Sequence, residues 1–182
     1  MTSNRYAHPL LISLANLKMK FRMKSSNHVF LLLALLPIPS FIHKIKCLRG
    51  MLADRLVHEC LDFVIWPLKI AASIGIIMSD PLEWHRFCFT PLAAYIVDTP
   101  EYTLLAGVLK TSSVTLASYK QLGNDFRHEP HTASTTLAQL HLLEEKVDPW
   151  DLEAYFEEAS KFHLNGVHQP FWIGLCPIHQ YS

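Results

Sequence analysis

The sequence has little glycine, few cysteines and a small share of charged residues. Its 182 residues include 6 glycines, 4 cysteines and 18% charged side chains. With half of the residues hydrophobic, this composition excludes a collagen-like chain and a disordered one. The four cysteines show no CxxC spacing, so we expect reduced, mostly buried thiols rather than a disulfide scaffold. The length suits one domain, and a core of that size can fold without disulfides.

Acidic residues are absent before Asp54, although the whole chain has 16 basic and 16 acidic residues. Half of the basic residues lie in that first stretch, at Arg5, Lys18, Lys20, Arg22, Lys24, Lys44, Lys46 and Arg49. Between residues 144 and 161 the balance reverses, with seven acids against two lysines. The zero net charge argues against nucleic-acid binding through overall charge. It leaves open a partner that contacts the basic first quarter alone.

Four of the basic residues alternate with apolar ones between residues 18 and 24. Lys18, Lys20, Arg22 and Lys24 have a period of two, so a strand would place all four charges on one face. Lysines of this kind can protect the exposed edge of a sheet, which is the simpler interpretation. They can also follow a row of DNA phosphates, which is the functional one.

Long hydrophobic runs of membrane-spanning length are also missing. Residues 29–36 form an apolar run of eight, followed by two prolines, which is short of the roughly 20 residues that a bilayer requires. Residues 61–78 contain Asp62, Pro67 and Lys69. We expect both segments to be buried core elements of a soluble, non-secreted protein. A small membrane-associated protein is the alternative.

The apolar pattern predicts a strand-rich first part, one long helix and a helical tail. We expect strands at residues 10–17 and 18–23, and a strand or a buried helical turn at 31–36. The clearest helix covers residues 50–74, with a kink at Pro67 and a stop at Gly75. The main positions of its apolar stripe are Leu52, Leu56, Cys60, Val64, Leu68 and Ala71. Residues 57, 61 and 65 widen this stripe.

The second half of the chain contains the clearest helix-start signals. We expect strands at residues 86–90 and 92–98, followed by a helix from Thr99 to about Gly107, with a hydroxyl cap and an early proline. A loop should cover residues 110–118. A helix should cover 134–147, and a second one, capped by Asp148, should end near Asn165. The fold class predicted is a mixed α+β (α/β) arrangement.

Asp98 is the most suggestive single residue for chemistry. A carboxylate at the end of a buried strand is a frequent position for a metal ligand, and Mg²⁺ prefers such hard oxygen ligands. The alternative is that Asp98 only caps the next helix. The sequence has no nucleophile elbow, Walker loop or GxGxxG motif, so no other reaction type has a candidate site.

Several collinear blocks resemble the Plavaka transposases, which are fungal DNA transposon proteins related to the CACTA group. The blocks are ISLAN at residues 12–16, PLAAYIVDTPE at 91–101, KTSSVT at 110–115, RHEP at 127–130, VDPWDL at 147–152 and Phe171-Trp172. The resemblance implies an RNase-H-like core in which Asp, Asp and Glu hold two Mg²⁺ ions. Asp98 would be the second acid and a metal ligand.

The same resemblance implies that the chain consists of four regions. Residues 1–109 would be a partial RNase-H-like core, 110–131 a linker, 132–172 a helical insertion and 173–182 a divergent tail. The first and third acids have no counterpart here, and KTSSVT stands where relatives carry paired cysteines. We therefore expect an interior fragment of a DDE-type transposase, inactive in strand transfer and without Mg²⁺ of its own.

Other expectations follow from the same resemblance. The partner would be DNA, contacted weakly through Lys18, Lys20, Arg22 and Lys24, with no small-molecule substrate. The protein would be nuclear or cytoplasmic. A DNA-binding remnant without catalytic function and a small membrane-associated protein remain the alternatives.

Overall fold

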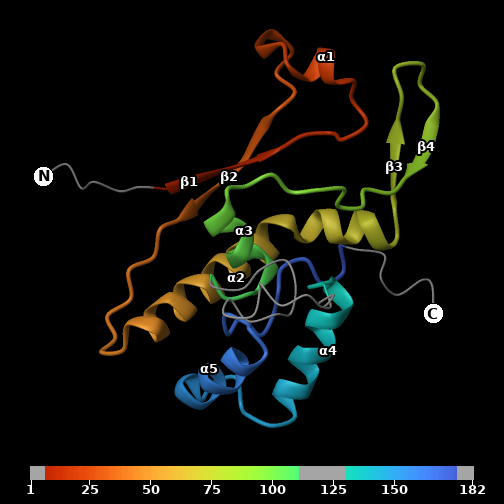
Figure 1. Cartoon of the computed structure of the whole chain (residues 1–182). Helices are drawn as coiled ribbons and strands as arrows, with labels where there is room; N and C mark the ends of the chain where they lie inside the picture. The colour runs from red at the N-terminus through yellow and green to blue at the C-terminus, as the bar shows by residue number, and fades with distance from the viewer. Residues whose placement is uncertain (1–6, 111–129, 176–182) are drawn as a thin grey trace, which may run out of the picture.

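The computed structural model describes residues 7–110 and 130–175, which form a mixed α+β fold (Figure 1). This confirms the fold class predicted from the sequence. The elements in chain order are β1 (Ala7–Ile12), α1 (Met19–Arg22), the 3₁₀ turn η1 (Ser25–Asn27), β2 (Leu31–Pro37), α2 (Lys46–Ser73), β3 (Ile76–Ser79), β4 (His85–Cys88), α3 (Thr99–Ala106), α4 (Ala133–Glu144) and α5 (Leu152–Lys161). The predicted loop at 110–131 lies, except for its ends, outside the described residues.

The strands of the described residues form two separate two-stranded sheets. β1 pairs with β2 and β3 pairs with β4, both antiparallel. The β1–β2 ribbon runs from the Ala7–Pro37 pair to the Ile12–Leu31 pair, with a bulge between Leu10 and Leu11. The family resemblance implies an RNase-H-like core, and this core stays a prediction.

The apolar run at residues 31–36 is a strand, but the expectation that it is buried is wrong. Most of its leucines are exposed, because β2 has one partner strand and packs on α2 with only part of its length. The second apolar segment, at residues 61–78, is also only partly buried: Leu61, Ile65 and Ala71 are covered, whereas Phe63 and Trp66 are not. In the described part of the chain, no helix combines the length and the apolar character needed to cross a membrane.

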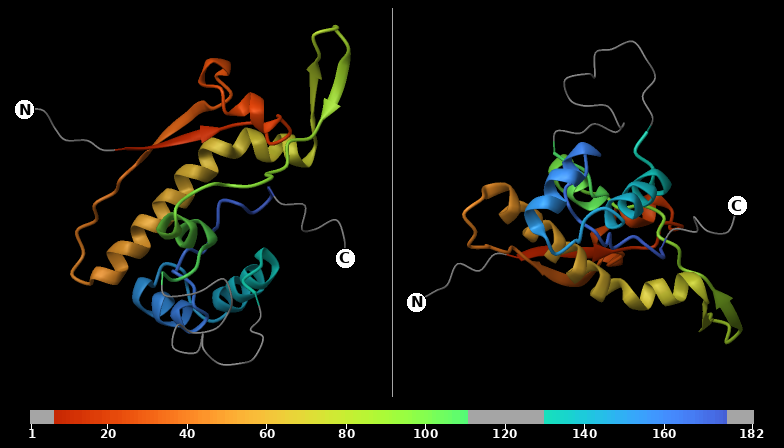
Figure 2. Two further views of the ribbon diagram at one scale, coloured as in Figure 1. Left: turned by 45° about the horizontal axis from the view of Figure 1, so that its top comes forward. Right: turned by 90° about the horizontal axis from the view of Figure 1, so that it is seen from below.

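Helix α2 is the central element of the fold. It lies between the β1–β2 ribbon on one side and helices α3, α4 and α5 on the other (Figures 1 and 2). It begins four residues before the predicted start and contains Pro67. The helix changes direction in its second half, as expected for a helix that contains a proline (Figure 1). Gly75, just after it, has a φ of 74° and lets the chain turn into β3.

The buried face of α2 coincides only in part with the stripe that the sequence indicated. The fully buried side chains are Leu48, Met51, His58, Leu61, Ile65 and Ala71. Of the nine predicted stripe positions, Leu61, Ile65 and Ala71 are buried and the other six are only half-buried. A helix that is apolar on most sides gives no unique stripe, so the packing of the other elements selects the face.

Two apolar clusters form the core. The first joins α4, α5 and the segment after α3, through Val108, Leu140, Leu143, Tyr155, Ala159 and Leu164. The second joins α2 to the C-terminal segment, through Leu61, Ile65, Phe171, Trp172 and Leu175. The indole Nε1 of Trp172 donates to the Leu105 carbonyl at 3.1 Å, which ties the same segment to α3. Both clusters therefore combine residues that are far apart in the sequence.

The two helices of the tail form close to where they were expected. α4 begins with a capping box in which Thr132 accepts from the Thr135 N–H at 3.1 Å, and the Thr135 hydroxyl accepts from the Thr132 N–H. The predicted cap of α5 is wrong by three residues, since Asp151 rather than Asp148 caps it. Asp148 instead accepts from the Trp150 N–H at 2.9 Å and forms the preceding turn.

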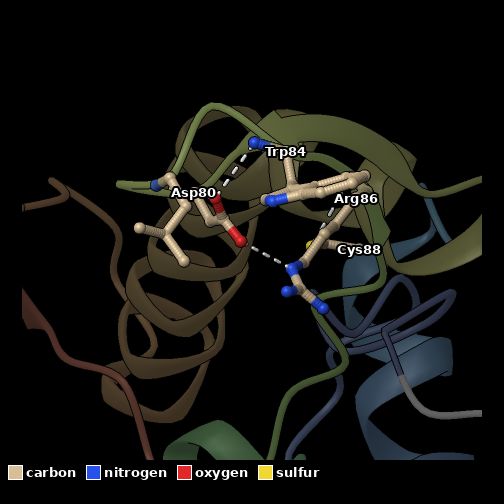
Figure 3. A network of polar contacts seen from close by, with 5 residues as sticks. Asp80, Trp84, Arg86 and Cys88 are labelled. Atoms are coloured by element: carbon tan, nitrogen blue, oxygen red, sulfur yellow. Dashed lines mark hydrogen bonds and ion pairs between the residues drawn. The ribbon is translucent and has the colours of Figure 1, made fainter.

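The β3–β4 hairpin projects beyond the rest of the described chain, from the C-terminal end of α2 (Figures 1 and 2). Its end is organised by Asp80 (Figure 3). The Oδ1 atom of Asp80 accepts from the N–H groups of Leu82 and Trp84, and Oδ2 accepts from Nε of Arg86 at 2.9 Å. We call this hairpin, residues 76–88, the β3–β4 arm.

Candidate functional site

The structure places Asp98 at the start of a helix, and the predicted strand before it is wrong. Residues 91–98 have no regular secondary structure and are mostly exposed. The apolar residues of this segment indicated a strand, but in the described residues no neighbouring strand pairs with it. Asp98 is therefore not the end of a buried strand.

The Asp98 carboxylate is the N-cap of α3. Its Oδ1 atom accepts from the Glu101 N–H at 3.0 Å, and its backbone is extended. The cap was expected at Thr99, one residue later, which is instead the first residue of the helix. At the other end, Gly107 closes the helix in the left-handed conformation, as the sequence predicted. The alternative interpretation of Asp98, as a helix cap, matches what the structure shows.

The surroundings of Asp98 do not fit a two-metal site. Glu101, one turn further on, lies 3.7 Å from Nδ1 of His8 and faces β1. Within residues 7–110 and 130–175, no group of three or more His, Cys, Asp or Glu side chains lies close enough together to hold a metal ion. A pair of Mg²⁺ ions needs several converging carboxylates. The described donor set does not fit the Mg²⁺ that the family resemblance implies.

The basic segment at residues 18–24 is helical, so the predicted strand there is wrong too. Residues 19–22 form the single turn α1, followed by η1. Lys18, Lys20 and Lys24 are exposed, whereas Arg22 folds back and donates from Nη2 to the Leu17 carbonyl at 3.2 Å. The four charges therefore do not share one strand face. Because the segment is no strand, protection of a sheet edge does not explain its lysines.

The exposed lysines of this segment have no acidic partner in the described part of the chain. None of Lys18, Lys20 and Lys24 takes part in an ion pair there. We call these three residues the α1 lysines. A second exposed basic group, Lys44, Lys46 and Arg49, lies at the start of α2, at the opposite end of the β1–β2 ribbon (Figure 1). The described basic residues of the first quarter are thus divided in space into two groups.

A buried polar network that sequence analysis missed joins α2 to the C-terminal segment. His58 is only 1% exposed, and its Nε2 lies 3.0 Å from the Leu104 carbonyl. Its Nδ1 accepts from the Phe171 N–H at 3.1 Å, so the neutral ring donates from Nε2. Asn165 donates to Oδ2 of Asp54 at 3.1 Å.

Burial shifts the ionisation of both titratable groups of this network. It lowers the pKa of His58 to about 4, although the hydrogen bond to Leu104 opposes the shift. It raises the pKa of Asp54 to about 6, against the opposing effects of the Lys110 ammonium and the Asn165 hydrogen bond. Burial therefore shifts the equilibrium of both groups toward their neutral forms.

Arg55 connects helix α2 to the segments before and after helix α5. Its Nε donates to the Gly166 carbonyl at 2.8 Å and its Nη1 donates to the Pro149 carbonyl at 2.7 Å. The guanidinium carbon lies 5.1 Å from the centre of the Tyr155 ring, a cation–π contact on a fully buried tyrosine. Residues 54, 55 and 58 are spaced so that they share one face of α2 with the buried Met51 and Leu61. This spacing could have indicated from the sequence that the three polar side chains face the interior.

The comparison with protein families identifies the chain. It matches the family model described as Plavaka transposase over residues 1–181. The protein belongs to the Plavaka transposase family and is transposon-derived. This confirms the resemblance seen in the sequence blocks. No curated protein and no solved structure matched the chain.

Proposed function

We propose that this chain is a DNA-contacting, non-catalytic member of the Plavaka transposase family. DNA is the macromolecule on which a transposase acts, so the family match supports DNA as the partner. The observation that carries the proposal is the exposure of the α1 lysines without an ion-pair partner in the described residues. Lysines that are not neutralised within their own protein remain available to neutralise phosphates.

The binding would be electrostatic and independent of base sequence. Each phosphate that a lysine neutralises releases condensed counterions, and the logarithm of the affinity falls with the logarithm of the salt concentration by about 0.9 per contact. Three lysines would therefore contribute a slope of about −3. The α1 turn has four residues and is too short to enter the major groove as a recognition helix, which favours contacts with the phosphate backbone.

Neutralising the α1 lysines is expected to weaken duplex DNA binding and flatten its salt dependence. In the triple variant Lys18→Gln, Lys20→Gln, Lys24→Gln, the salt slope measured by fluorescence anisotropy should fall by about 3. The matched control is Lys44→Gln, Lys46→Gln, Arg49→Gln, which removes the same charge at the other end of the ribbon. Absence of binding by the wild-type chain at low salt contradicts the proposal. Equal effects of both triple variants would assign the binding to charge alone and not to the α1 lysines.

The role of the Asp98 carboxylate as the cap of α3 supports the proposal that the chain is not catalytic. Removal of an Asp N-cap costs about 1 kcal/mol, so Asp98→Ala should lower the free energy of unfolding by that amount. We expect no Mg²⁺-dependent nicking of supercoiled DNA by the wild-type chain and no change in Asp98→Ala. Asp98→Asn, which keeps an acceptor oxygen for the cap, should lose less stability. Nicking that disappears in the stable Asp98→Asn variant would sink this part of the proposal.

A further inference from the structure

A small pocket lies in the segment that connects β1 to β2. All of its lining residues fall between Ile12 and Leu31, and its volume is about 410 Å³. This volume lies within the range of roughly 300–1,000 Å³ that small-molecule sites occupy. Leu14, Leu17 and Leu31 supply apolar walls, and Phe21 forms another part of the lining. We call this feature the α1 pocket.

Phe21 lies between two of the α1 lysines in the turn. The Phe21 N–H donates to the Lys18 carbonyl at 2.9 Å, and the Lys24 N–H donates to the Phe21 carbonyl at 3.4 Å. Hydrogen bonds between residues three apart bring their side chains onto the same side of a turn. Phe21 is 51% exposed, and both lysines are exposed. The turn therefore places one lysine before and one after an accessible aromatic ring.

Hydrogen bonds within the connecting segment hold the α1 pocket in shape. Asn27 donates from Nδ2 to the Phe21 carbonyl at 2.7 Å, which fixes η1 against α1. Arg22 donates to the Leu17 carbonyl at 3.2 Å, which fixes the start of the turn. Two parts of the lining, at Phe21 and Leu17, are thus held in place before a ligand binds. A preorganised site loses less entropy on binding.

The charge around the α1 pocket fits a polyanion. No acidic residue occurs between residues 12 and 31, and the α1 lysines have no ion pair within the described ranges. A nucleic acid combines phosphates, which the lysines attract, with bases that stack on an aromatic ring. In a paired duplex the bases lie inside the stack, where a protein side chain does not reach them. An unpaired base has a free face that can contact Phe21.

An anionic membrane is the other partner that attracts exposed lysines beside apolar side chains. The polar lining of the pocket favours the base. Ser13, Asn27 and His28 contribute to the lining, and the buried hydroxyl of Ser13 has no hydrogen-bond partner in the part of the chain that the structure describes. The edge of a base can supply such a partner, whereas an acyl chain cannot. The four-residue turn α1 is also far shorter than the amphipathic helices that lie on membranes.

We propose that the α1 pocket binds an unpaired DNA base, with Phe21 stacked on the base and the α1 lysines on the neighbouring phosphates. This inference rests on the proposed DNA contact of the α1 lysines and adds the kind of DNA that they prefer. Its ligands are DNA molecules with a base outside the double-helical stack, as at a bulge or in a single strand. Stacking depends little on base identity, so the preference is for an unpaired base and not for a sequence.

The test is fluorescence anisotropy with two DNA probes that carry the same charge. One is a duplex with a single bulged thymidine, and the other is the same duplex with an abasic nucleotide at the bulge. The wild-type chain should bind the probe with the base at least about fivefold more tightly, as expected for one stacking contact. In Phe21→Leu the two affinities should become equal. Phe21→Tyr keeps an aromatic ring and should retain the difference.

The matched control for the pocket is Phe30→Leu. Phe30 is also 51% exposed, but it does not line the pocket, so this variant should keep the wild-type preference. A preference that survives in Phe21→Leu, or that disappears equally in Phe30→Leu, overturns the inference. So does binding to phosphatidylserine vesicles that is lost in Phe21→Leu while the preference for the base persists, because the surface would then belong to a membrane.

The fully paired duplex separates this inference from the proposed function. A wild type that binds the paired duplex through the α1 lysines, and binds the two bulged probes equally, refutes the base-binding pocket and leaves the proposed function standing. A wild type that binds no DNA at low salt refutes both.

Discussion

Replacing His58 by leucine is expected to lower the free energy of unfolding by about 1–3 kcal/mol. Leucine has a similar volume, so the packing is kept while two hydrogen bonds are lost. The Phe171 N–H would remain in a buried position without its partner, whereas the Leu104 carbonyl still accepts from the Gly107 N–H and from Asn165 Nδ2. Each unsatisfied buried group costs about 1–3 kcal/mol. Urea unfolding followed by circular dichroism measures the loss.

Two further variants separate the hydrogen bonds from packing. His58→Gln keeps a donor and an acceptor on a side chain of comparable length and should retain more stability than His58→Leu. Glu59→Gln, at the exposed neighbouring position, should change stability by no more than about 0.5 kcal/mol. Hydrogen exchange of the Phe171 amide should accelerate in His58→Leu beyond the change in global stability. A leucine variant as stable as the wild type would show that the network contributes nothing.

Asp54→Asn is expected to make the protein more sensitive to acid than the wild type. Between pH 7 and pH 4, the free energy of unfolding of this variant should fall by about 2 kcal/mol more than that of the wild type. The reason is that Asp54 and His58 have opposite effects on stability over nearly the same pH range. Asparagine keeps the acceptor for Asn165, so the variant removes the titration and not the hydrogen bond.

The His58 effect destabilises the protein as the pH falls. Burial lowers the pKa of His58 from 6.5 to about 4 in the folded state. Between these pH values the unfolded chain binds a proton that the folded protein does not, so acidification favours unfolding. A shift of one pKa unit corresponds to about 1.4 kcal/mol, which gives an effect on the order of 3 kcal/mol.

The Asp54 effect has the opposite sign. Burial raises the pKa of Asp54 from 3.8 to about 6 in the folded state. As the pH falls below 6, the folded protein binds a proton before the unfolded chain does, so acidification favours folding until about pH 4. The effect is on the order of 2 kcal/mol and offsets most of the His58 effect.

Unfolding measured at several pH values checks both signs. His168 and His131 also have pKa values lowered by burial, and both are present in every variant, so the difference from the wild type isolates Asp54. His58→Gln should show the reverse behaviour, with a stability that rises relative to that of the wild type as the pH falls from 6.5 to 4. A wild type and an Asp54→Asn variant with parallel pH profiles would show that Asp54 does not titrate in this range.

Helix boundaries with strong local signals were predictable from the sequence. The end of α3 at Gly107 and the start of α4 near Thr132 follow from glycine and hydroxyl side chains that act within one turn of the chain. The strands predicted at residues 18–23 and 92–98 were wrong. In both segments an alternating or apolar pattern indicated a strand, but a strand also needs a neighbour with which to pair, and the sequence does not show whether one exists.

The candidate site could be predicted only in part. The sequence singled out Asp98 and offered the cap as one of two roles, whereas the DNA-binding role of the basic segment stays a prediction. The roles of His58, Asp54 and Arg55 were missed, because their partners are backbone groups and side chains about 50 to 110 positions away. Such partners have no local sequence pattern.

The sequence by itself determined the family, the mixed fold class, the helices of the tail and the separation of charge along the chain. These depend on residue identity and on neighbours within a turn or two. The tertiary structure decided which face of α2 is buried, because that helix is apolar on most sides and packing has to choose among them. It also decided that Asp98 caps a helix and that the basic residues fall into two groups at opposite ends of the β1–β2 ribbon, since both depend on where distant segments pack.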